Sequence, residues 1–447
     1  MKLIASASGM PDRVMEFTQR STCIVGRSAD CQIQIASNKT TQTVSRYHCL
    51  IEVSPPQIYV RDFGSLNGTL VNGQEIGKRH ADESIEDGRS KDSRQQELSD
   101  GDVIQIAGLT LSVAIEQAIP ETVAFPSIES RESDPVDALK KLLEGPVEEK
   151  EDEQPLVEGY PILRKLGEGG MGLIYLARDQ LSNAKAVIKV MHPRVAMDEW
   201  NARSFLREAR NSQAVKHENI VEVKQFGKAE DFFYIVLEYC NLGSVAQLIR
   251  SHGPLEVNVA IPIIRHILNG LVYAHQVELP NVRLGDGTDA RAKGLVHRDL
   301  SPENLLLQRQ NGKESRVRAK IADFGLSKAF DLAGLSGFTN TGTYAGKPYF
   351  VCRQQVLNYR NCKPEVDVWA AAASLYFMLT GSYPREFHKD KDAWLTVLKE
   401  KPIPIRSRRP QVPKRLASLI DAALEDRNDE LHFESAAEFQ SELSGTI

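Results

Sequence analysis

A glycine-rich segment, GEGGMG at 167–172, lies between two runs of β-type residues at 160–166 and 173–177. Glycine permits backbone conformations that bring main-chain N–H groups close to a phosphate, so the segment could form a hairpin over phosphate oxygens. A dinucleotide-binding fold has the same glycine spacing but continues as a helix, whereas this chain continues as a strand. The segment therefore predicts a phosphate-binding hairpin, although by itself it is a weak signal.

Charged and amide side chains suited to phosphate chemistry follow in order. Lys189 ends the apolar strand AVIK, and Glu208 lies in the helical segment after it. Asp299 belongs to a His-Arg-Asp segment, Asn304 follows five residues later, and Asp323 opens Asp-Phe-Gly. Each has an ordinary structural interpretation, because a lysine at a strand end is usually solvated and an aspartate often supports a turn. All five in this order are far more specific than any one alone.

These motifs resemble the eukaryotic-type (Hanks-type) protein kinase family, in its bacterial serine/threonine form, over about residues 160–447. The resemblance implies an α+β bilobal fold that uses ATP and Mg²⁺ to phosphorylate serine or threonine of protein substrates. It also implies a small lobe over about 158–238 and a large lobe over about 241–447, joined by a hinge. The ATP-binding residues that it implies are Gly167, Gly169, Gly170, Gly172, Ile174, Lys189, Glu238 and Cys240.

The chemistry of phosphoryl transfer explains these residue types. Charge spreads over the phosphoryl oxygens in the transition state, so catalysis is mainly positioning and electrostatic neutralisation. By resemblance, Lys189 holds the α- and β-phosphates and is oriented by Glu208. Asn304 and Asp323 supply the oxygen ligands that Mg²⁺ prefers. Asp299 accepts or orients the proton of the substrate hydroxyl.

Two positions near Asp299 depart from the family pattern. Serine/threonine kinases commonly have a lysine two residues after the catalytic aspartate and a threonine in the substrate-facing loop, where this chain has Ser301 and Lys347. Our hypothesis is that Lys347 reaches into the active site and supplies the missing cation, which makes both residues catalytic candidates. The alternative is an exposed lysine with no catalytic role.

A catalytically weak or inactive pseudokinase scaffold is the alternative to an active enzyme. Degenerate kinases usually lose one of the five residues named above, and this chain keeps all five. Activity is therefore the favoured interpretation.

A second departure is Cys-Arg-Gln at 352–354, where the family has Ala-Pro-Glu and the glutamate pairs with a buried arginine. Aligning the C-terminal segment with the family places His432 at that arginine. Neutral replacements at both positions would avoid an uncompensated buried charge, which costs about 3–5 kcal/mol. Asp367 still matches the aspartate that supports the catalytic loop. We also expect the polar segment 277–293, an addition to the family pattern, to form a surface hairpin or loop.

The activation segment contains three closely spaced threonines, which resemble those autophosphorylated in many bacterial kinases. Arg298 is the nearest positional candidate to bind the resulting phosphate and order the segment. The alternative is that threonines beside glycines are ordinary loop residues. The predicted phosphorylation sites are Thr339, Thr341 and Thr343.

Residues 1–118 carry short alternating apolar and polar runs separated by Gly, Asn and Asp, a pattern typical of an all-β sandwich. Three segments, GR at 26–27, SRYH at 45–48 and DFGSLNGT at 62–69, fall on turns in the order and spacing of FHA domains. The resemblance implies recognition of phosphothreonine partners.

Charged guanidinium groups and hydroxyl donors at loop tips suit a dianionic phosphate. We interpret His48 as a structural hydrogen-bonding residue. The phosphopeptide-binding residues that the resemblance implies are Arg27 and Ser45 for the phosphate, Arg46 for added charge, and Asn67 for the peptide backbone.

The chain thus divides into an FHA-like domain over 1–118, an acidic linker over 119–157 and a kinase domain over 158–447. The linker is rich in Pro, Glu and Ser, and within it 133–145 has the spacing of a short helix. The segment 77–96 is charged and lacks an apolar period, which predicts a mobile loop.

Composition limits the partners and the compartment. A chain of 447 residues with 41% hydrophobic content exceeds one ordinary core. A net charge of −5 gives no support for a nucleic-acid or anionic-membrane partner. Six scattered cysteines without a C-x-x-C pair fit a reducing compartment. The longest apolar run, 368–379, is too short to span a membrane and predicts a buried helix. We therefore expect a cytoplasmic protein with no membrane span and no nucleic-acid partner.

Overall fold

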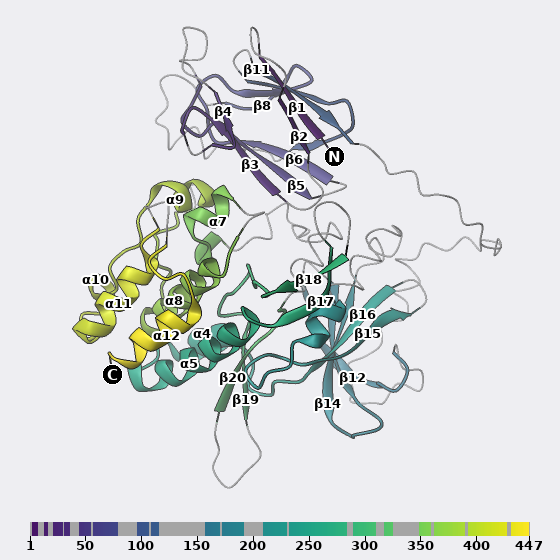
Figure 1. Cartoon of the computed structure of the whole chain (residues 1–447), viewed down its shortest axis with the longest axis vertical. Helices are drawn as coiled ribbons and strands as arrows, with labels where there is room; N and C mark the ends of the chain where they lie inside the picture. The colour runs from purple at the N-terminus through teal and green to yellow at the C-terminus, as the bar shows by residue number, and fades with distance from the viewer. Residues whose placement is uncertain are drawn as a thin grey trace, which may run out of the picture.

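A computed structural model of the chain places the N-terminal part above two lobes that lie side by side (Figure 1). The structure describes residues 2–7, 13–16, 21–29, 31–35, 44–54, 57–78, 96–106, 109–115, 157–169, 172–191, 209–229, 232–283, 289–309, 317–324, 348–358, 362–388, 392–426 and 431–446. The predicted linker helix at 133–145 lies outside these residues, as does most of the charged segment 77–96.

The N-terminal part is a sandwich of two β-sheets, as its alternating pattern predicts. Strand β11 shows why, since its residues alternate between buried and half-buried positions along its length. The first sheet runs in the order β2 (Arg13–Glu16), β1 (Lys2–Ala7), β11 (Leu109–Ala114), β10 (Val103–Ile106), β7 (Thr69–Val71) and β8 (Gln74–Gly77). The second runs in the order β4 (Ile33–Gln34), β3 (Ser21–Gly26), β5 (Cys49–Ser54), β6 (Gln57–Asp62) and β9 (Gln96–Leu98).

The small lobe is one antiparallel sheet in which the glycine-rich segment forms a hairpin. Gly169 lies opposite Gly172 in the strand register, so β12 and β13 pair as a hairpin, as the sequence predicts. The backbone at 209–214 is helical. The sheet order is β12 (Ile162–Gly169), β13 (Gly172–Arg178), β14 (Lys185–Met191), β16 (Phe232–Glu238) and β15 (Val223–Ala229).

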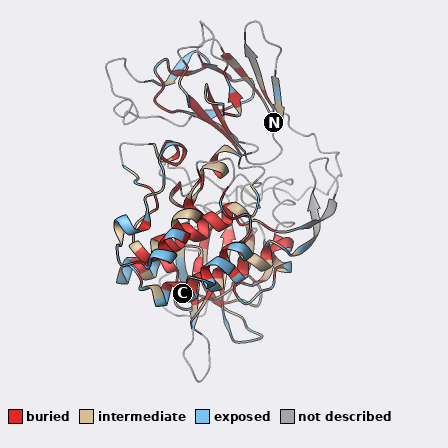
Figure 2. Cartoon of the chain, turned by 60° about the vertical axis from the view of Figure 1, so that its left-hand side comes forward, coloured by how far each residue is buried: buried red, intermediate tan, exposed pale blue. Residues whose placement is uncertain are grey.

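The large lobe is helical, and its helices are buried where they face one another (Figure 2). The predicted buried helix is α8, which has almost no exposed side chain. Two antiparallel strand pairs complete the lobe: β17 (Glu278–Arg283) with β18 (Asp289–Lys293), and β19 (Leu305–Arg309) with β20 (Val317–Ile321). The first pair confirms the predicted hairpin in 277–293. The helices are α4 (Val245–His252), α5 (Val257–Ala274), η2 (Pro348–Phe350), α7 (Arg353–Leu357), α8 (Glu365–Thr380), α9 (Ala393–Lys399), α10 (Ile405–Arg408), α11 (Lys414–Leu424) and α12 (Ala436–Ser444).

Helix α5 is the single helix in the described ranges that is long and apolar enough to cross a membrane. It packs against α8, α12 and β20, and half of its residues are buried inside the protein. Its apolar composition is therefore explained by its place in the core of the large lobe.

A buried ion pair joins Arg385 to Asp426 beneath α7, and both side chains are 1% exposed. The Asp426 carboxylate also accepts a 2.8 Å hydrogen bond from the Arg353 backbone N–H. The Arg385 guanidinium donates to the Glu400 carbonyl at 3.0 Å and lies 5.1 Å from the ring centroid of Trp369. These bonds compensate the two charges.

This pair corrects the expectation of neutral partners at Gln354 and His432. His432 is exposed and its ring contacts Phe433, so it does not lie beneath α7. Gln354 instead donates a 3.1 Å hydrogen bond to the backbone carbonyl of Asp426. Charge compensation is thus retained, but residues 385 and 426 supply it. A carboxylate and a guanidinium 41 positions apart give no local signal in the sequence.

The sandwich packs directly against α7 and α9 of the large lobe (Figure 1). Arg61 of β6 forms a 2.9 Å ion pair with Asp392, which also caps α9 by accepting from the N–H groups of two of its residues. Gln32 donates through its side chain to the Leu357 carbonyl. One apolar cluster spans the contact and comprises Ile24, Cys31, Leu50, Phe63, Val356, Trp394, Leu395, Val397 and Leu398.

The Arg385–Asp426 pair predicts a strong dependence of stability on charge balance. We expect Arg385→Met to lower the free energy of unfolding by about 3–5 kcal/mol, because Asp426 is left buried without its cation. Replacing both residues, as Arg385→Met with Asp426→Leu, removes the uncompensated charge and should cost less than the sum of the two single changes. Urea unfolding followed by tryptophan fluorescence measures this, since Trp369 lies beside Arg385. Additive losses would contradict the pairing.

Candidate active site

Lys189 is held in the middle of the small-lobe sheet, where β14 lies between β13 and β16. Its Nζ donates to both carboxylate oxygens of Asp323, at 2.6 Å for Oδ2. The two side chains are 17% and 18% exposed, so the ion pair lies partly screened from water at the junction of the lobes. Residues 134 positions apart in the chain therefore meet at one point.

Asp367 fixes the backbone of the predicted catalytic loop, residues 297–304. This carboxylate in α8 is fully buried and accepts hydrogen bonds from the backbone N–H groups of His297 at 2.7 Å and Arg298 at 2.9 Å. It also bonds the His275 ring at 2.8 Å. Burial by itself disfavours the charged form, but the bond and charge of His275 and the nearby His297 lower the pKa of Asp367 below its ordinary value.

Two residues of the site have strained backbone conformations. Arg298 has φ of 67° and Asp323 has φ of 61°, both in the left-handed region. Such conformations cost about 1–3 kcal/mol for residues other than glycine and persist where surrounding bonds impose them. The Asp367 bond to the Arg298 N–H is one such bond, and the Gln355 side chain donates to the Arg298 carbonyl at 2.6 Å.

Four backbone and side-chain bonds bring Asp299, Asn304 and Asp323 together. The Asn304 amide donates to the Asp299 carbonyl at 2.7 Å and to its carboxylate at 3.2 Å. The Ala322 N–H donates to the Asn304 carbonyl at 2.8 Å, and the Ala322 carbonyl bonds the His297 ring at 2.9 Å. Asp323 is the next residue. Four sequence-predicted residues, Lys189 included, therefore converge on one locus between the lobes.

The hinge end of β16 contains an ion pair that sequence reasoning missed. Lys320 of β20 donates to Glu238 at 2.8 Å, and Gln308 donates to the other carboxylate oxygen at 2.8 Å. Burial opposes ionisation of Glu238, but these bonds hold the pKa of its carboxyl below the ordinary value. The Glu238 side chain therefore ties the hinge to the large lobe. Cys240 is buried beside it, and burial raises the pKa of its thiol to about 12.

The remaining predicted residues of the kinase domain fall into two groups. Ser301 is buried at 1% exposure, and its carbonyl accepts from the Asn304 N–H at 2.8 Å. Gly167, Gly169, Gly172 and Ile174 lie on the β12–β13 hairpin. The predicted residues outside the described part of the chain are Gly170, Glu208, Lys347, Thr339, Thr341 and Thr343.

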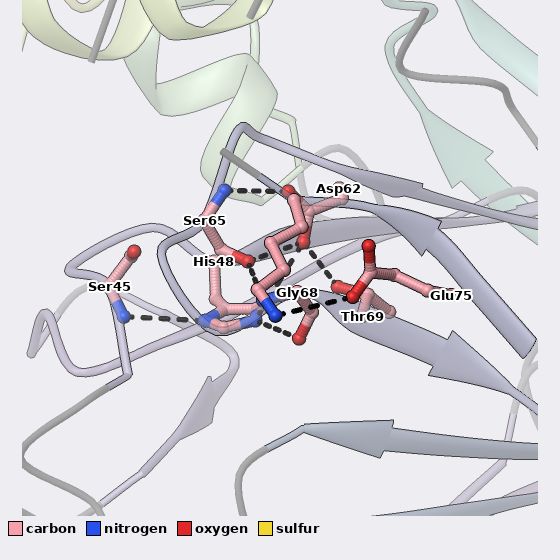
Figure 3. A network of polar contacts seen from close by, with 8 residues as sticks. Ser45, His48, Asp62, Ser65, Gly68, Thr69 and Glu75 are labelled. Atoms are coloured by element: carbon pink, nitrogen blue, oxygen red, sulfur yellow. Dashed lines mark hydrogen bonds and ion pairs between the residues drawn. The ribbon is translucent and has the colours of Figure 1, made fainter. Parts of the chain in front are cut away.

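In the N-terminal sandwich, His48 ties together the loops that carry the predicted phosphopeptide residues (Figure 3). Its buried ring accepts from the Ser45 N–H at 3.3 Å and bonds the Gly68 carbonyl, which follows Asn67, at 3.0 Å. The Arg27 N–H donates to the Ser45 carbonyl at 3.1 Å. The structural interpretation of His48 is thus confirmed.

The Asp62 carboxylate holds the loop at 62–69 in its conformation. Its carboxylate accepts from the Ser65 N–H at 2.6 Å, the Ser65 hydroxyl at 2.7 Å and the Thr69 hydroxyl (Figure 3). The Ser65 hydroxyl in turn accepts from the Gly68 N–H at 2.9 Å. These bonds hold the turn that presents Asn67 next to the Ser45 loop.

The protein kinase domain model matches residues 160–430, which is more than half of the chain. The chain belongs to the protein kinase family. The FHA domain model matches residues 23–107, so the kinase domain follows an FHA domain. The all-β sandwich and the bilobal α+β fold predicted from the sequence are both confirmed.

The curated relatives are longer proteins. Serine/threonine-protein kinase PrkC of Bacillus subtilis (strain 168) is 27% identical over 285 residues, which cover 64% of this chain and 40% of PrkC. Serine/threonine-protein kinase pkn3 of Myxococcus xanthus is 29% identical over 292 residues, which cover 64% of this chain and 49% of pkn3. This kinase thus spans less than half the length of either relative. The crystal structure of Rad53 1–466 with AMP-PNP is 20% identical, with a TM-score of 0.48, and the match covers 99% of this chain and 98% of that one.

The buried His48 predicts that acid destabilises the FHA domain. Burial lowers the pKa of His48 below its ordinary value of 6.5, although Asp62 and the Gly68 carbonyl partly oppose this. The unfolded chain therefore binds a proton that the folded domain does not, and the free energy of unfolding should fall as the pH drops below about 6.5. Nuclear magnetic resonance of the His48 ring should give a midpoint below 6.5, and His48→Gln should flatten the pH dependence of stability. A midpoint at or above 6.5 would refute this.

Proposed function

We propose that this chain is an ATP-dependent protein kinase that transfers the γ-phosphate to serine or threonine of proteins and recognises phosphothreonine through its FHA domain. The observation that carries the proposal is the meeting of Lys189, Asp299, Asn304 and Asp323 at one locus between the lobes. The serine/threonine preference rests on the kinase relatives and on the bacterial form of the glycine-rich segment.

The donor set fits a nucleotide with Mg²⁺. Asp323 offers a carboxylate. The Asn304 amide nitrogen donates to the carbonyl and the carboxylate of Asp299, which directs the amide oxygen away from that residue. Hard cations such as Mg²⁺ take oxygen ligands of these kinds together with phosphate oxygens. The Lys189 ammonium adjoins Asp323, so phosphate oxygens bound there would meet both cations. Bound Mg²⁺ would neutralise charge on the phosphates.

The residues of the chain perform three tasks in this proposal. Lys189 positions the phosphates, and Asp299 accepts or orients the proton of the substrate hydroxyl. The Asn304 bonds to Asp299 keep that carboxylate beside the metal-binding residues. Asp367 keeps the loop backbone in the strained conformation on which this arrangement depends.

The proposed partners are inferred from the two domains, and the proposed location from the cysteines. Protein substrates with serine or threonine and phosphothreonine-containing proteins are the proposed partners. The arrangement of Arg27 beside Ser45, joined through His48 to the Asn67 loop, supports the FHA part of the proposal. We propose a cytoplasmic location, because the six cysteines, which all lie in the described ranges, form no disulfide there.

Loss of Asp299 should abolish phosphorylation. We expect Asp299→Asn to lower the rate by about 10²–10⁴-fold, because general-base contributions are of that size. Incubation with ATP, mass spectrometry and phosphoamino-acid analysis measure it. Wild-type protein should gain phosphate on Thr339, Thr341 or Thr343, and Asp299→Asn should not. An Asp179→Asn variant changes an exposed turn in the small lobe and serves as the matched control. No labelling of the wild type would favour a non-enzymatic scaffold.

We propose that Lys347 supplies a cation beside Asp299. It would replace the lysine that the family commonly has at the position of Ser301. If it contacts the transferring phosphate, Lys347→Met should slow substrate phosphorylation by about tenfold or more, the size of one charge-assisted hydrogen bond. Initial rates on a generic protein substrate such as myelin basic protein provide the measurement. Lys414→Met removes an exposed charge from α11 and should leave the rate unchanged. Equal rates for Lys347→Met and wild type would contradict a role of Lys347 in the active site.

A further inference from the structure

A pocket of about 400 Å³ opens where the FHA domain meets the large lobe. The FHA domain contributes the two loops that follow Gly26 and Val44, and the kinase domain contributes the start of α7 and the end of α9. Its six lining residues include three cations and two hydroxyl groups, with no carboxylate among them. They are Ser28, Arg46, Tyr47, Arg353, Leu398 and Lys399.

The FHA side of the pocket is continuous with the proposed phosphothreonine site. Ser28 directly follows Arg27, and Arg46 directly follows Ser45. The two loops are locked together, because the Ser28 N–H donates to the Arg46 carbonyl at 3.0 Å. Gly26 is required for this approach, since a Cβ at that position would overlap the Arg46 carbonyl oxygen. A phosphate bound at these loops would therefore lie at the mouth of the pocket.

The kinase side presents cations that the structure holds in position. The Arg353 guanidinium donates to the Leu398 carbonyl at 3.3 Å and to the Tyr47 hydroxyl of the FHA domain at 3.3 Å. Its backbone N–H donates to Asp426, the partner of Arg385. Lys399 lies exposed at the last turn of α9, on the rim. Positive charge from two domains thus faces one cavity.

We propose that this pocket is a composite phosphate site, in which a phosphothreonine peptide on the FHA loops is also bound by Arg353 and Lys399 of the kinase domain. The proposal rests on the phosphothreonine recognition proposed above and extends it. Guanidinium and ammonium donors form charge-assisted hydrogen bonds with phosphate oxygens, and the Ser28 hydroxyl adds a neutral donor.

A composite site has a consequence for the kinase domain. A ligand that contacts both domains binds the docked arrangement more tightly than an undocked one, so binding and docking stabilise each other. Arg353 lies near the end of the activation segment, where its backbone N–H donates a hydrogen bond to Asp426. The state of the phosphothreonine site is thereby coupled to the segment that receives the substrate.

The test uses the full chain carrying Asp299→Asn, so that no self-phosphorylated threonine competes for the pocket. The probe is a fluorescein-labelled degenerate peptide pool with a fixed central phosphothreonine, and a pool with unphosphorylated threonine is its match. Fluorescence anisotropy gives the apparent Kd of each pool. Inorganic phosphate is added as a competitor to distinguish a free anion from a phosphopeptide.

We expect the parent to prefer the phosphorylated pool and Arg46→Gln to weaken that binding. Arg353→Gln should raise the apparent Kd by about tenfold and Lys399→Gln by about threefold, as for loss of charged hydrogen bonds of unequal exposure. Lys414→Gln removes the same kind of charge from the same lobe, away from the pocket, and should change the Kd less than twofold. Lys399 is exposed, whereas Arg353 bonds Tyr47 across the domain contact, so the Lys399 variant tests the pocket independently of that bond.

Two results would overturn the composite site. One is a phosphopeptide Kd unchanged in Arg353→Gln and Lys399→Gln while Arg46→Gln is weakened, which leaves recognition to the FHA domain alone. The other is a general anion surface. It would be indicated if Arg353→Gln and Lys399→Gln weakened binding of the unphosphorylated pool equally, or if inorganic phosphate displaced the phosphopeptide at concentrations near the peptide's Kd. A parent with no preference for the phosphorylated pool would instead refute the underlying FHA function.

Discussion

The arrangement of the active site depends on one buried carboxylate. Asp367 is surrounded by the core of the large lobe, where an isolated charge would be prohibitively costly, and it is retained because three donors converge on it. Two of the donors are backbone N–H groups of the catalytic loop, so the loop can satisfy the charge only in one conformation. The left-handed Arg298 is part of that conformation. The packing of α8 in the core therefore also fixes the backbone geometry next to Asp299.

Local motifs made most of the active site predictable. Lys189, Asp299, Asn304 and Asp323 each belong to a short pattern whose spacing the chemistry requires, and the glycine-rich hairpin follows from strand periodicity on both sides. What the sequence did not predict are pairs between distant segments. Glu238 with Lys320 and Arg385 with Asp426 involve ordinary surface-type residues, and neither partner has a local pattern that marks it as buried. The expectation for His432 failed for that reason, because alignment by position cannot reveal that a charge pair has moved.

The domain contact did leave a signal in the sequence. In β3, Cys23 and Val25 point into the sandwich core, while Ile24 between them belongs to the cluster shared with the large lobe. Strand β5 repeats this with Cys49 and Ile51 inside and Leu50 outside. A strand with one solvated face alternates apolar and polar residues, so unbroken apolar runs indicate burial on both faces. Those runs predict that something covers the sheet, but not what covers it.

Covering the sheet with the kinase domain ties recognition to catalysis through shared elements. The loop after β3 carries Arg27 and Ser28, and the strand itself packs on α7, which begins with Arg353. Helix α7 also supplies Gln355, which bonds the Arg298 carbonyl of the catalytic loop at 2.6 Å. A continuous path of packed and hydrogen-bonded residues therefore runs from the FHA loops to the residue before Asp299. Helix α7 is short and bonded at both ends, to Asp426 through the Arg353 N–H and to Gln32 through the Leu357 carbonyl. It therefore joins the FHA contact to both the Arg298 carbonyl and the Arg385–Asp426 pair.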